Sequence, residues 1–442
     1  MSMSASRSSV MWFRRDLRVR DNPALLAALE EGPVTGLFVL DPALWAGAGP
    51  ARRAWLAANV LALSERIPLT IELGDPRDVV PRVAGGRRVH VSAETTPHGR
   101  RRDDAVAEQV ELVATGSPYA VGPGLVHNGS GDPYQVFTAY ARAWRERGWP
   151  EPAPTPRSAD LEPADSHPRA LALLEEALAD APFDLPAAGE DAAWRRWHEF
   201  RRDGMAAYRE ERDRPDHDGT SRLSPYLHLG VLHPRSLLAE LDTRSTYAVE
   251  LAWREFYADV LWHSPASAWA DLRPALSAMA YDDPEDAIAA WRTGTTGYPI
   301  VDAGMRQLLH TGWMHNRVRM ITASFLTKDL HVWWPVGAGH FLDLLIDGDV
   351  ASNNHGWQWV AGTGTDASPY FRVFNPITQG LKFDPQGNYV RRWVRELDHL
   401  AGNAVHEPWK SAVGYERGYP LRIVDHADER REALERYRAA RG

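Results

Sequence analysis

Three stretches of the sequence place polar side chains at spacings that suit ligand binding. In residues 219–224 (GTSRLS), small hydroxyl residues stand directly before a helical run. Such hydroxyls either cap free N–H groups at a helix start or help to bind an anion there. In GWMHNRVRM, Asn316, Arg319 and Met320 are three and four residues apart, so a helix places them on one face. That face serves either packing or a ligand.

The third stretch is acidic and amide-rich. Asp347 and Asp349 lie in IDGDV, and Asn353 follows in NNHGWQW. A carboxylate can pair with an arginine and orient it, and the positive charge keeps the carboxylate ionised. An amide such as Asn353 both donates and accepts hydrogen bonds. Taken alone, each of these stretches could also be merely structural.

The composition excludes several other chemistries. The 442-residue chain has no cysteine, which excludes disulfides, thiolate catalysis and thiolate-bound metals. Its 17 histidines form no HExxH or comparable ligand pair, so we expect no metal site. The net charge of −9 means that any DNA binding must rest on a local basic patch. Of 18 tryptophans, 11 lie at or after Trp253, which suits base stacking, electron transfer or core packing.

Neither membrane insertion nor export is expected. No apolar run approaches the roughly 18 residues that a membrane span needs. The first ten residues, MSMSASRSSV, contain no apolar signal-peptide core, and the C-terminal RYRAARG is not a lipidation signal. We therefore expect a cytoplasmic protein.

Two kinds of hydrophobic pattern divide the chain. In the first 125 residues or so, short β-branched runs alternate with helical ones, which predicts a doubly wound α/β domain with a parallel sheet. The predicted strands are residues 10–13, 34–40, 69–73 and 89–91, and the predicted helices are residues 23–30, 52–64, 79–84 and 101–114. Neither a GxGxxG after the first strand nor a Walker A motif is present, so dinucleotide binding of the NAD type and P-loop chemistry are unsupported.

Helices dominate the rest of the chain. Residues 151–168 are proline-rich and typical of a surface connector. Amphipathic stretches then follow at residues 194–212, 247–262 and 300–309. We predict an α/β domain over residues 1–128, a connector over residues 129–191 and a large all-α domain over residues 192–442.

Motifs spread over most of the chain resemble those of the photolyase/cryptochrome family. WFRRDLRVRDNPAL, which begins at Trp12, is similar to the N-terminal motif of that family. Further similar segments follow in order: PYQVF, GTSRLSPYL, ELAWREFY, TGYPIVDAGMRQL, GWMHNRVRMITASFLTKDL, DLLIDGDVASNNHGWQW, GTGTDASPYFRVFNP and VHEPWK. The pattern is most like class I cyclobutane pyrimidine dimer photolyases.

The resemblance implies a bound FAD that works as a reduced anion. In the family, the GTSRLS segment holds the diphosphate, and the face with Asn316, Arg319 and Met320 meets the isoalloxazine ring. Asp347 and Asp349 match the acidic partners of that face, which implies an Arg319–Asp347 ion pair beside the ring. Asn353 matches an asparagine that faces flavin N5, where plant-type cryptochromes usually carry aspartate, so it favours repair over signalling. The residues implied in FAD binding are Tyr208, Thr220, Ser221, Arg222, Leu223, Ser224, Arg254, Asn316, Arg319, Asp347, Gly348, Asp349 and Asn353.

The resemblance also implies a slot for a flipped-out pyrimidine dimer. Trp253 and Trp359 match the indoles that wall it, and Glu250 matches a carboxyl that hydrogen-bonds the thymine carbonyls. Arg212, Arg317, Arg372 and Lys382 match contacts to DNA phosphates. Met320, Asn316, Asn353 and Glu250 form the implied catalytic set. On their own, the indoles could equally be core, and the charged side chains could be solvated surface.

The implied activity is light-driven repair of cyclobutane dimers by a monomer without an obligate protein partner. Asn316 and Met320 stand where (6-4) photolyases typically place histidines, and neither side chain can donate a transferable proton. Two alternatives remain open, namely a blue-light-sensing cryptochrome without repair activity and a (6-4) photolyase.

Two further expectations concern light capture and flavin reduction. The surroundings of Arg52 and Arg100 resemble the deazaflavin-binding type, which favours 8-hydroxy-5-deazaflavin over folate as an antenna pigment. Thr96 stands where that type carries an acidic residue, so folate or no antenna pigment remains open. Trp357 and Trp334 match the inner members of the family's tryptophan relay, and Tyr281 takes the outer position. Trp291 or Trp333 could serve as the exit instead, and all of these rings could simply be packing aromatics.

Overall fold

The computed structural model describes residues 8–156, 161–162, 165–276, 278–365 and 372–441. Two compact units divide the chain: the first comprises Met1–Glu199 and Arg222–Pro265, and the second comprises Phe200–Ser221 and Ala266–Gly442. Residues 157–160 and 163–164 of the predicted connector lie outside the described residues. The first unit takes in residues 222–265, which the division by element type assigns to the helical part. The domain limits themselves remain a prediction.

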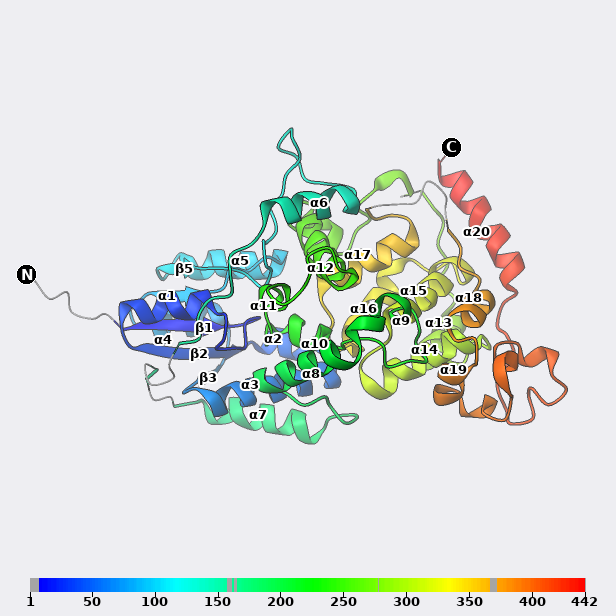
Figure 1. Cartoon of the computed structure of the whole chain (residues 1–442), viewed down its shortest axis with the longest axis horizontal. Helices are drawn as coiled ribbons and strands as arrows, with labels where there is room; N and C mark the ends of the chain where they lie inside the picture. Colours follow the sequence, from blue (N-terminus) through cyan, green and yellow to red (C-terminus); the bar gives the residue numbers. More distant parts are fainter. Residues whose placement is uncertain (1–7, 157–160, 163–164, 277, 366–371, 442) are drawn as a thin grey trace, which may run out of the picture. The chain divides into compact units, whose positions relative to one another are not determined.

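The first unit contains a five-stranded parallel sheet (Figure 1), as predicted for a doubly wound domain. Its strand order is β3-β2-β1-β4-β5, so the chain winds outward from β1 first to one edge and then to the other. The central strand β1 is buried along its whole length, which explains its continuous apolar sequence. The strands are β1 (Ser9–Phe13), β2 (Val34–Leu40), β3 (Thr70–Leu73), β4 (Val89–Val91) and β5 (Leu112–Ala114).

The fifth strand corrects the predicted helix over residues 101–114. Helix α5 (Pro97–Ala107) begins at Thr96, whose Oγ1 accepts a hydrogen bond from Gly99 N at 3.1 Å, and it ends seven residues earlier than predicted. Residues 112–114 instead pair in parallel with β4. In the sequence, Val106, Val110 and Val113 are four and three residues apart, as on one helix face, so only the pairing with β4 selects the strand conformation.

The helices of the first unit connect the strands and then continue beyond the sheet. They are α1 (Pro23–Glu31), α2 (Pro42–Ala46), α3 (Pro50–Arg66), α4 (Pro76–Ala84), α5, α6 (Phe137–Arg147), α7 (Pro168–Ala179), most of α8 (Glu190–Asp203), α10 (Ser224–His228), α11 (Pro234–Leu238) and α12 (Thr246–His263). The predicted helix over residues 194–212 is interrupted, because α8 ends at Asp203 and α9 begins only at Tyr208.

The second unit is helical in its described residues, in agreement with the predicted all-α part. Its core is built from buried side chains of the central helices and includes Trp291, Trp334 and Trp357. The helices are α9 (Tyr208–Glu211), α13 (Glu285–Thr293), α14 (Pro299–Thr311), α15 (Asn316–Ser324), α16 (Trp334–Leu344), α17 (Val350–Ala361), α18 (Pro376–Phe383), α19 (Asn388–Trp393) and α20 (His426–Arg441).

Two features are absent from the described residues. No helix among them combines the length and the apolar character needed to cross a membrane. Nor do histidine and carboxylate side chains gather there in groups of three or more that could hold a metal ion.

Candidate functional site

The predicted ligand-facing helix is α15, which starts directly after His315. The His315 Nδ1 accepts a hydrogen bond from Arg317 N at 3.2 Å and so caps the helix. Asn316 is exposed, whereas Arg319 and Met320 are half-buried. The one-face arrangement that the spacing predicts is therefore realised on a single helix.

Arg319 forms the predicted ion pair with Asp347. Its Nη2 donates to Asp347 Oδ2 at 2.8 Å, and its Nε donates to the Met314 carbonyl at 2.8 Å. The Asp347 side chain is 2% exposed and the Arg319 side chain is 24% exposed, so the guanidinium keeps one accessible side. The fixed guanidinium provides positive charge beside the exposed end of α15.

The loop after Asp347 leads into α17. Gly348 N donates to the Leu345 carbonyl at 3.1 Å, and the Asp349 carboxylate caps α17 by accepting from Ser352 N at 2.9 Å. These bonds fix the first turn of the helix that carries Asn353.

The amide of Asn353 is oriented by two acceptors. Its Nδ2 donates to the Ala338 carbonyl at 3.1 Å and to Asn354 Oδ1 at 2.8 Å. Because a backbone carbonyl can only accept, the amide nitrogen must lie on that side, which leaves Oδ1 as the outward group. Gly356 lies on the same face of α17, and a Cβ built there meets nothing within 4 Å. An acceptor beside open space fits a planar ring that presents an N–H group, as a reduced flavin does at N5.

The GTSRLS segment crosses from the second unit to the first at Arg222. The backbone of Arg222 has φ 53°, in the left-handed region that few non-glycine residues adopt. The N-cap of the following short helix α10 is Leu223, which makes no side-chain cap. Ser221 is buried and Thr220 is half-buried, while Arg222 and Ser224 are exposed.

Tyr208 lies in the second unit, at the start of α9. Its ring packs edge-on against Phe200 with centroids 5.6 Å apart, and the Arg212 guanidinium lies 5.9 Å from the ring centroid. These two predicted residues, one for FAD and one for DNA, are thus neighbours within the second unit.

Helix α12 carries Glu250, Trp253 and Arg254 in the first unit. The Trp253 ring stacks on Phe137 with centroids 3.6 Å apart and planes 9° apart, and it also contacts Phe256 and Tyr257. One face of the indole is therefore covered by Phe137, and the stack fixes its plane. Glu250 and Trp253 are both half-buried.

Arg254 has partners that the sequence did not indicate. Its Nη1 donates to the Pro118 carbonyl at 3.0 Å and its Nη2 donates to the Leu227 carbonyl at 3.1 Å. Its guanidinium also lies 4.3 Å from the Tyr119 ring centroid. These contacts give Arg254 a structural role within the first unit in addition to the predicted FAD contact.

The neighbouring Glu255 fixes α12 to the loop at residues 120–122. Its carboxylate accepts from Val121 N at 3.0 Å and from Trp144 Nε1 at 2.8 Å. Burial raises the pKa of the Glu255 carboxyl above its ordinary value, and these hydrogen bonds offset only part of that rise. The predicted substrate residues of the first unit therefore stand on a rigidly held helix.

Two of the predicted phosphate contacts meet on one aromatic ring. The Arg317 guanidinium lies 4.6 Å and the Lys382 Nζ lies 4.9 Å from the Phe383 ring centroid. Arg317 also pairs with Asp213 at 2.9 Å, a partner that the sequence analysis missed. Arg372 is exposed. The structure thus places two cations together in the second unit, one of them already neutralised.

The predicted relay rings are partly connected. Trp357 packs against Gly337 of α16, where a Cβ would stand 2.2 Å from the indole Cη2. Gly337 is one turn after Trp334 on the same helix, so the two indoles share that helix face. Among the described residues, the Tyr281 ring has no ring contact with either indole. Trp359 is half-buried and packs against the core of the second unit.

The predicted antenna residues lie in the first unit. The Arg100 guanidinium stacks 3.8 Å from the Trp262 ring centroid, and Thr96 caps α5. Arg52 lies in the first turn of α3. Stacking on Trp262 accounts structurally for Arg100 without a pigment.

Several residues of these groups were missed by sequence reasoning, namely Phe137, Asp213, Gly337 and Asp271, whose Oδ1 accepts from Trp334 Nε1 at 2.7 Å. Gly337 had one usable signal, because a glycine inside a helix marks close packing. The other three act through contacts with residues far along the chain, which no local pattern reveals.

Comparisons with known proteins match both parts of the chain. Residues 9–158 match the family model described as DNA photolyase, and residues 247–439 match the FAD binding domain of DNA photolyase. The deoxyribodipyrimidine photo-lyase of Escherichia coli (strain K12) is 41% identical over 478 residues, which cover 98% of each protein.

Solved structures agree. A bacterial class III photolyase from Agrobacterium tumefaciens matches with a TM-score of 0.87 and 36% identity, over 100% of this chain and 99% of that one. An archaeal photolyase from Sulfolobus tokodaii, solved with two FAD molecules, matches with a TM-score of 0.85 and 28% identity, over 98% of this chain and 99% of that one. The chain therefore belongs to the DNA photolyase family, and its helical part is a FAD-binding domain.

Proposed function

We propose that this photolyase uses blue light to split cyclobutane pyrimidine dimers in DNA. The observation that carries the proposal is the fixed amide of Asn353. Its outward Oδ1 is a hydrogen-bond acceptor and so requires a donor on the ligand. A reduced flavin carries such an N–H at N5, so Asn353 selects the redox state that repair requires. An aspartate at this position would lack the N–H group that now donates to the Ala338 carbonyl.

The proposed FAD contacts are those that the family resemblance implies. Arg319, oriented by Asp347, supplies positive charge for the reduced anion. The diphosphate side is bound by Tyr208, Thr220, Ser221, Arg222, Leu223, Ser224 and Arg254, and Gly348, Asp349 and Asn316 complete the set. When it is bound and reduced, FAD would supply the redox chemistry: after it absorbs blue light, it provides the electron that splits the dimer and later recovers that electron.

The substrate is a dimer flipped out of the DNA stack. Trp253, held flat against Phe137, offers one indole face for stacking, and Trp359 forms the other wall. Glu250 hydrogen-bonds the thymine carbonyls in its protonated or proton-sharing form. The DNA phosphates are bound by Arg212, Arg317, Arg372 and Lys382. Arg317 gives up its ion pair with Asp213 when it binds a phosphate.

The side chains of α15 favour the cyclobutane lesion. Repair of this lesion needs an electron in and an electron back but no proton donor. Asn316 and Met320 cannot donate a transferable proton, which fits this chemistry and not that of (6-4) lesions.

We also assign 8-hydroxy-5-deazaflavin as an antenna pigment, in preference to folate, near Arg52, Thr96 and Arg100. The Sulfolobus relative holds a second FAD, so a second flavin is the competing pigment. We further propose that the protein is a cytoplasmic monomer. Pigment extraction, chromatography and mass analysis of the purified protein test the assignment of the pigments.

The test of the function uses two oligonucleotides, one with a cyclobutane dimer and one with a (6-4) product. Chemically reduced, FAD-loaded protein is illuminated with each, and restored thymines are counted by liquid chromatography. We expect restoration of the cyclobutane lesion alone, and only in light. Restoration of neither lesion by a FAD-loaded protein would favour a sensor, and restoration of the (6-4) product alone would overturn the lesion assignment.

A further inference from the structure

The buried indole Trp334 has two candidates for the residue that joins it to solvent, Trp333 and Tyr281. The geometry points to Trp333 as the surface end of an electron relay that runs inward through Trp334 and Trp357. The inference rests on the proposed flavin chemistry, since the relay would serve to reduce that cofactor.

The inner step joins Trp357 to α16. Trp357 lies against Gly337, where a Cβ would stand 2.2 Å from Cη2 and 2.6 Å from Cζ3 of the indole. Only a glycine permits this approach, and it brings the Trp357 ring to the helix face that carries Trp334 one turn earlier.

Trp334 is set up to carry a transient positive charge. Its side chain is fully buried, and its Nε1 donates to Asp271 Oδ1 at 2.7 Å. A hydrogen bond to a carboxylate is stronger when the donor is cationic. Asp271 therefore stabilises a Trp334 that has lost one electron.

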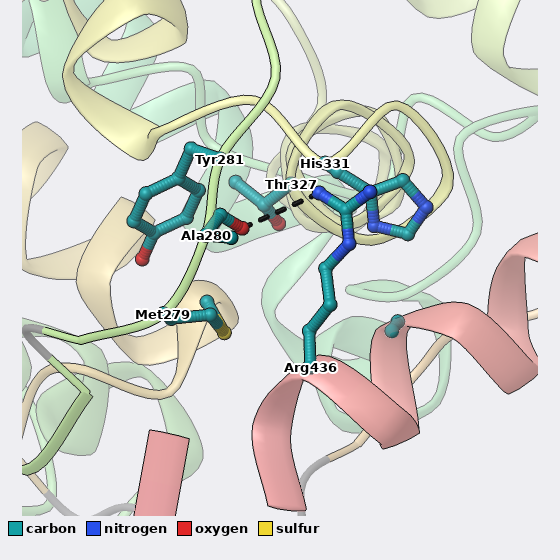
Figure 2. A pocket seen from close by; sticks show the side chains of 7 residues that line it. Met279, Ala280, Tyr281, Thr327, His331 and Arg436 are labelled. Atoms are coloured by element: carbon teal, nitrogen blue, oxygen red, sulfur yellow. Dashed lines mark hydrogen bonds between the residues drawn. The ribbon is translucent and has the colours of Figure 1, made fainter. Parts of the chain in front are cut away.

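Tyr281 is poorly placed to be the exit. A tyrosine that loses an electron must also lose its phenolic proton, yet the Tyr281 hydroxyl is buried and has no hydrogen-bond partner among the described residues. Burial, and to a smaller degree the charge of Asp271, raise the pKa of Tyr281. Figure 2 shows the hydroxyl pointing away from Arg436 and His331, the ionisable side chains drawn near it.

Trp333 has what Tyr281 lacks. It is 39% exposed, and its ring contacts Trp334 edge-on with centroids 6.4 Å apart and planes at 66°. Trp291 also contacts Trp357, with centroids 6.0 Å apart, but it is fully buried and its Nε1 donates to the Thr322 carbonyl. Of these rings, Trp333 alone both contacts a relay tryptophan and is exposed to water.

The electrons balance as follows. Trp334, having given one electron inward through Trp357, receives one from Trp333, so Trp333 ends oxidised by one electron. Its indole N–H proton passes to water. A soluble one-electron donor such as a thiol, with a proton from water, restores Trp333.

The test compares Trp333→Phe, Tyr281→Phe and Trp334→Phe. Each protein is loaded with oxidised FAD and illuminated with a thiol, and the loss of the oxidised flavin absorbance is followed. We expect Trp333→Phe to slow photoreduction nearly as much as Trp334→Phe, whereas Tyr281→Phe stays close to the wild type. A normal rate in Trp333→Phe, or a large loss in Tyr281→Phe alone, would overturn the inference.

A second readout does not depend on flavin reduction rates. The wild type is illuminated without a thiol, digested, and searched by peptide mass spectrometry for oxidised aromatic residues. Oxidation should concentrate at Trp333, and oxidation at Tyr281 instead would contradict the assignment. Repair by chemically reduced wild type is measured separately, so a failure of the proposed function is told apart from a failure of the relay.

Discussion

We propose that Asn353 favours one redox state of the flavin beside it, because its amide is already fixed by two hydrogen bonds. The Ala338 carbonyl and Asn354 Oδ1 accept both protons of Nδ2. A carboxylate at this position would face the Ala338 carbonyl without a donor. In this proposal, the Asn353 amide nitrogen makes structural hydrogen bonds, and its Oδ1 accepts a hydrogen bond from the flavin.

Replacing Asn353 with aspartate should break both roles. We expect Asn353→Asp to lower the free energy of unfolding by about 1–3 kcal/mol, since an acceptor is left facing an acceptor. It should also lower the yield of fully reduced flavin. Thermal unfolding and flavin absorbance measure the two effects.

Asn388→Asp is the matched control. Asn388 is exposed, and its Oδ1 already accepts from Arg391, so the same chemical change should cost nothing there. Equal behaviour of the two variants would show that charge alone, and not the fixed amide, explains any effect.

Trp253 supports the second residue-scale prediction. Trp253→Ala should weaken binding to dimer-containing DNA by about 1–3 kcal/mol, the usual contribution of a base stacked on an aromatic ring. FAD content should stay near normal. Fluorescence titration with dimer and undamaged oligonucleotides measures the difference.

The control for Trp253 is Trp45→Ala, which removes an indole from α2, outside α12. It should bind dimer DNA as the wild type does. If Trp253→Ala also binds normally, its stack on Phe137 is core packing and the slot lies elsewhere.

At the scale of elements, α16 and α17 pack closely because α16 carries a glycine, Gly337, where they meet. Gly337 lets the Trp357 ring lie against the backbone of α16, whereas Gly339 on the same helix faces open space. The close approach positions Trp357 and Asn353, which both stand on α17. The packing of the two helices thus fixes the proposed relay residue Trp357 and the proposed flavin contact Asn353 together.

Alanine substitutions at these two glycines should have opposite effects. Gly337→Ala forces the Trp357 indole to move and should destabilise the protein by about 1–3 kcal/mol, the usual cost of overpacking. Gly339→Ala should be neutral or stabilise by about 0.5–1 kcal/mol, because alanine is the better helix residue. Thermal unfolding checks both, and equal melting temperatures would contradict the packing account.

The elements that the sequence predicts well are those with a clear period. The four predicted strands of the first part became β1 to β4, and the spacing of Asn316, Arg319 and Met320 was realised on α15. β5 was missed because Val106, Val110 and Val113 keep a helical spacing, and only the pairing with β4 orders residues 112–114 as a strand. Arg319 was correctly paired with Asp347 through the family resemblance, not through any local pattern.

At the scale of the whole molecule, the proposed site residues are distributed over the two units, each of which is built from two separate stretches of the sequence. Trp253 and Glu250 belong to the first unit, whereas Trp359, Arg319 and Asn353 belong to the second. The sequence division near residue 192 separates sheet from helix and so could not foresee that α12 belongs to the first unit. That assignment depends on long-range bonds such as those of Glu255 with Val121 and Trp144.

The central claim is that light absorbed by the reduced flavoprotein restores two thymines from one cyclobutane dimer. The most direct measurement is a single saturating blue flash on chemically reduced, FAD-loaded protein bound to a defined dimer oligonucleotide, followed by chromatography of the DNA. We predict restored thymines after one flash and none in the dark. An unchanged dimer after repeated flashes, with the DNA shown to be bound and the flavin shown to be reduced, would contradict the account.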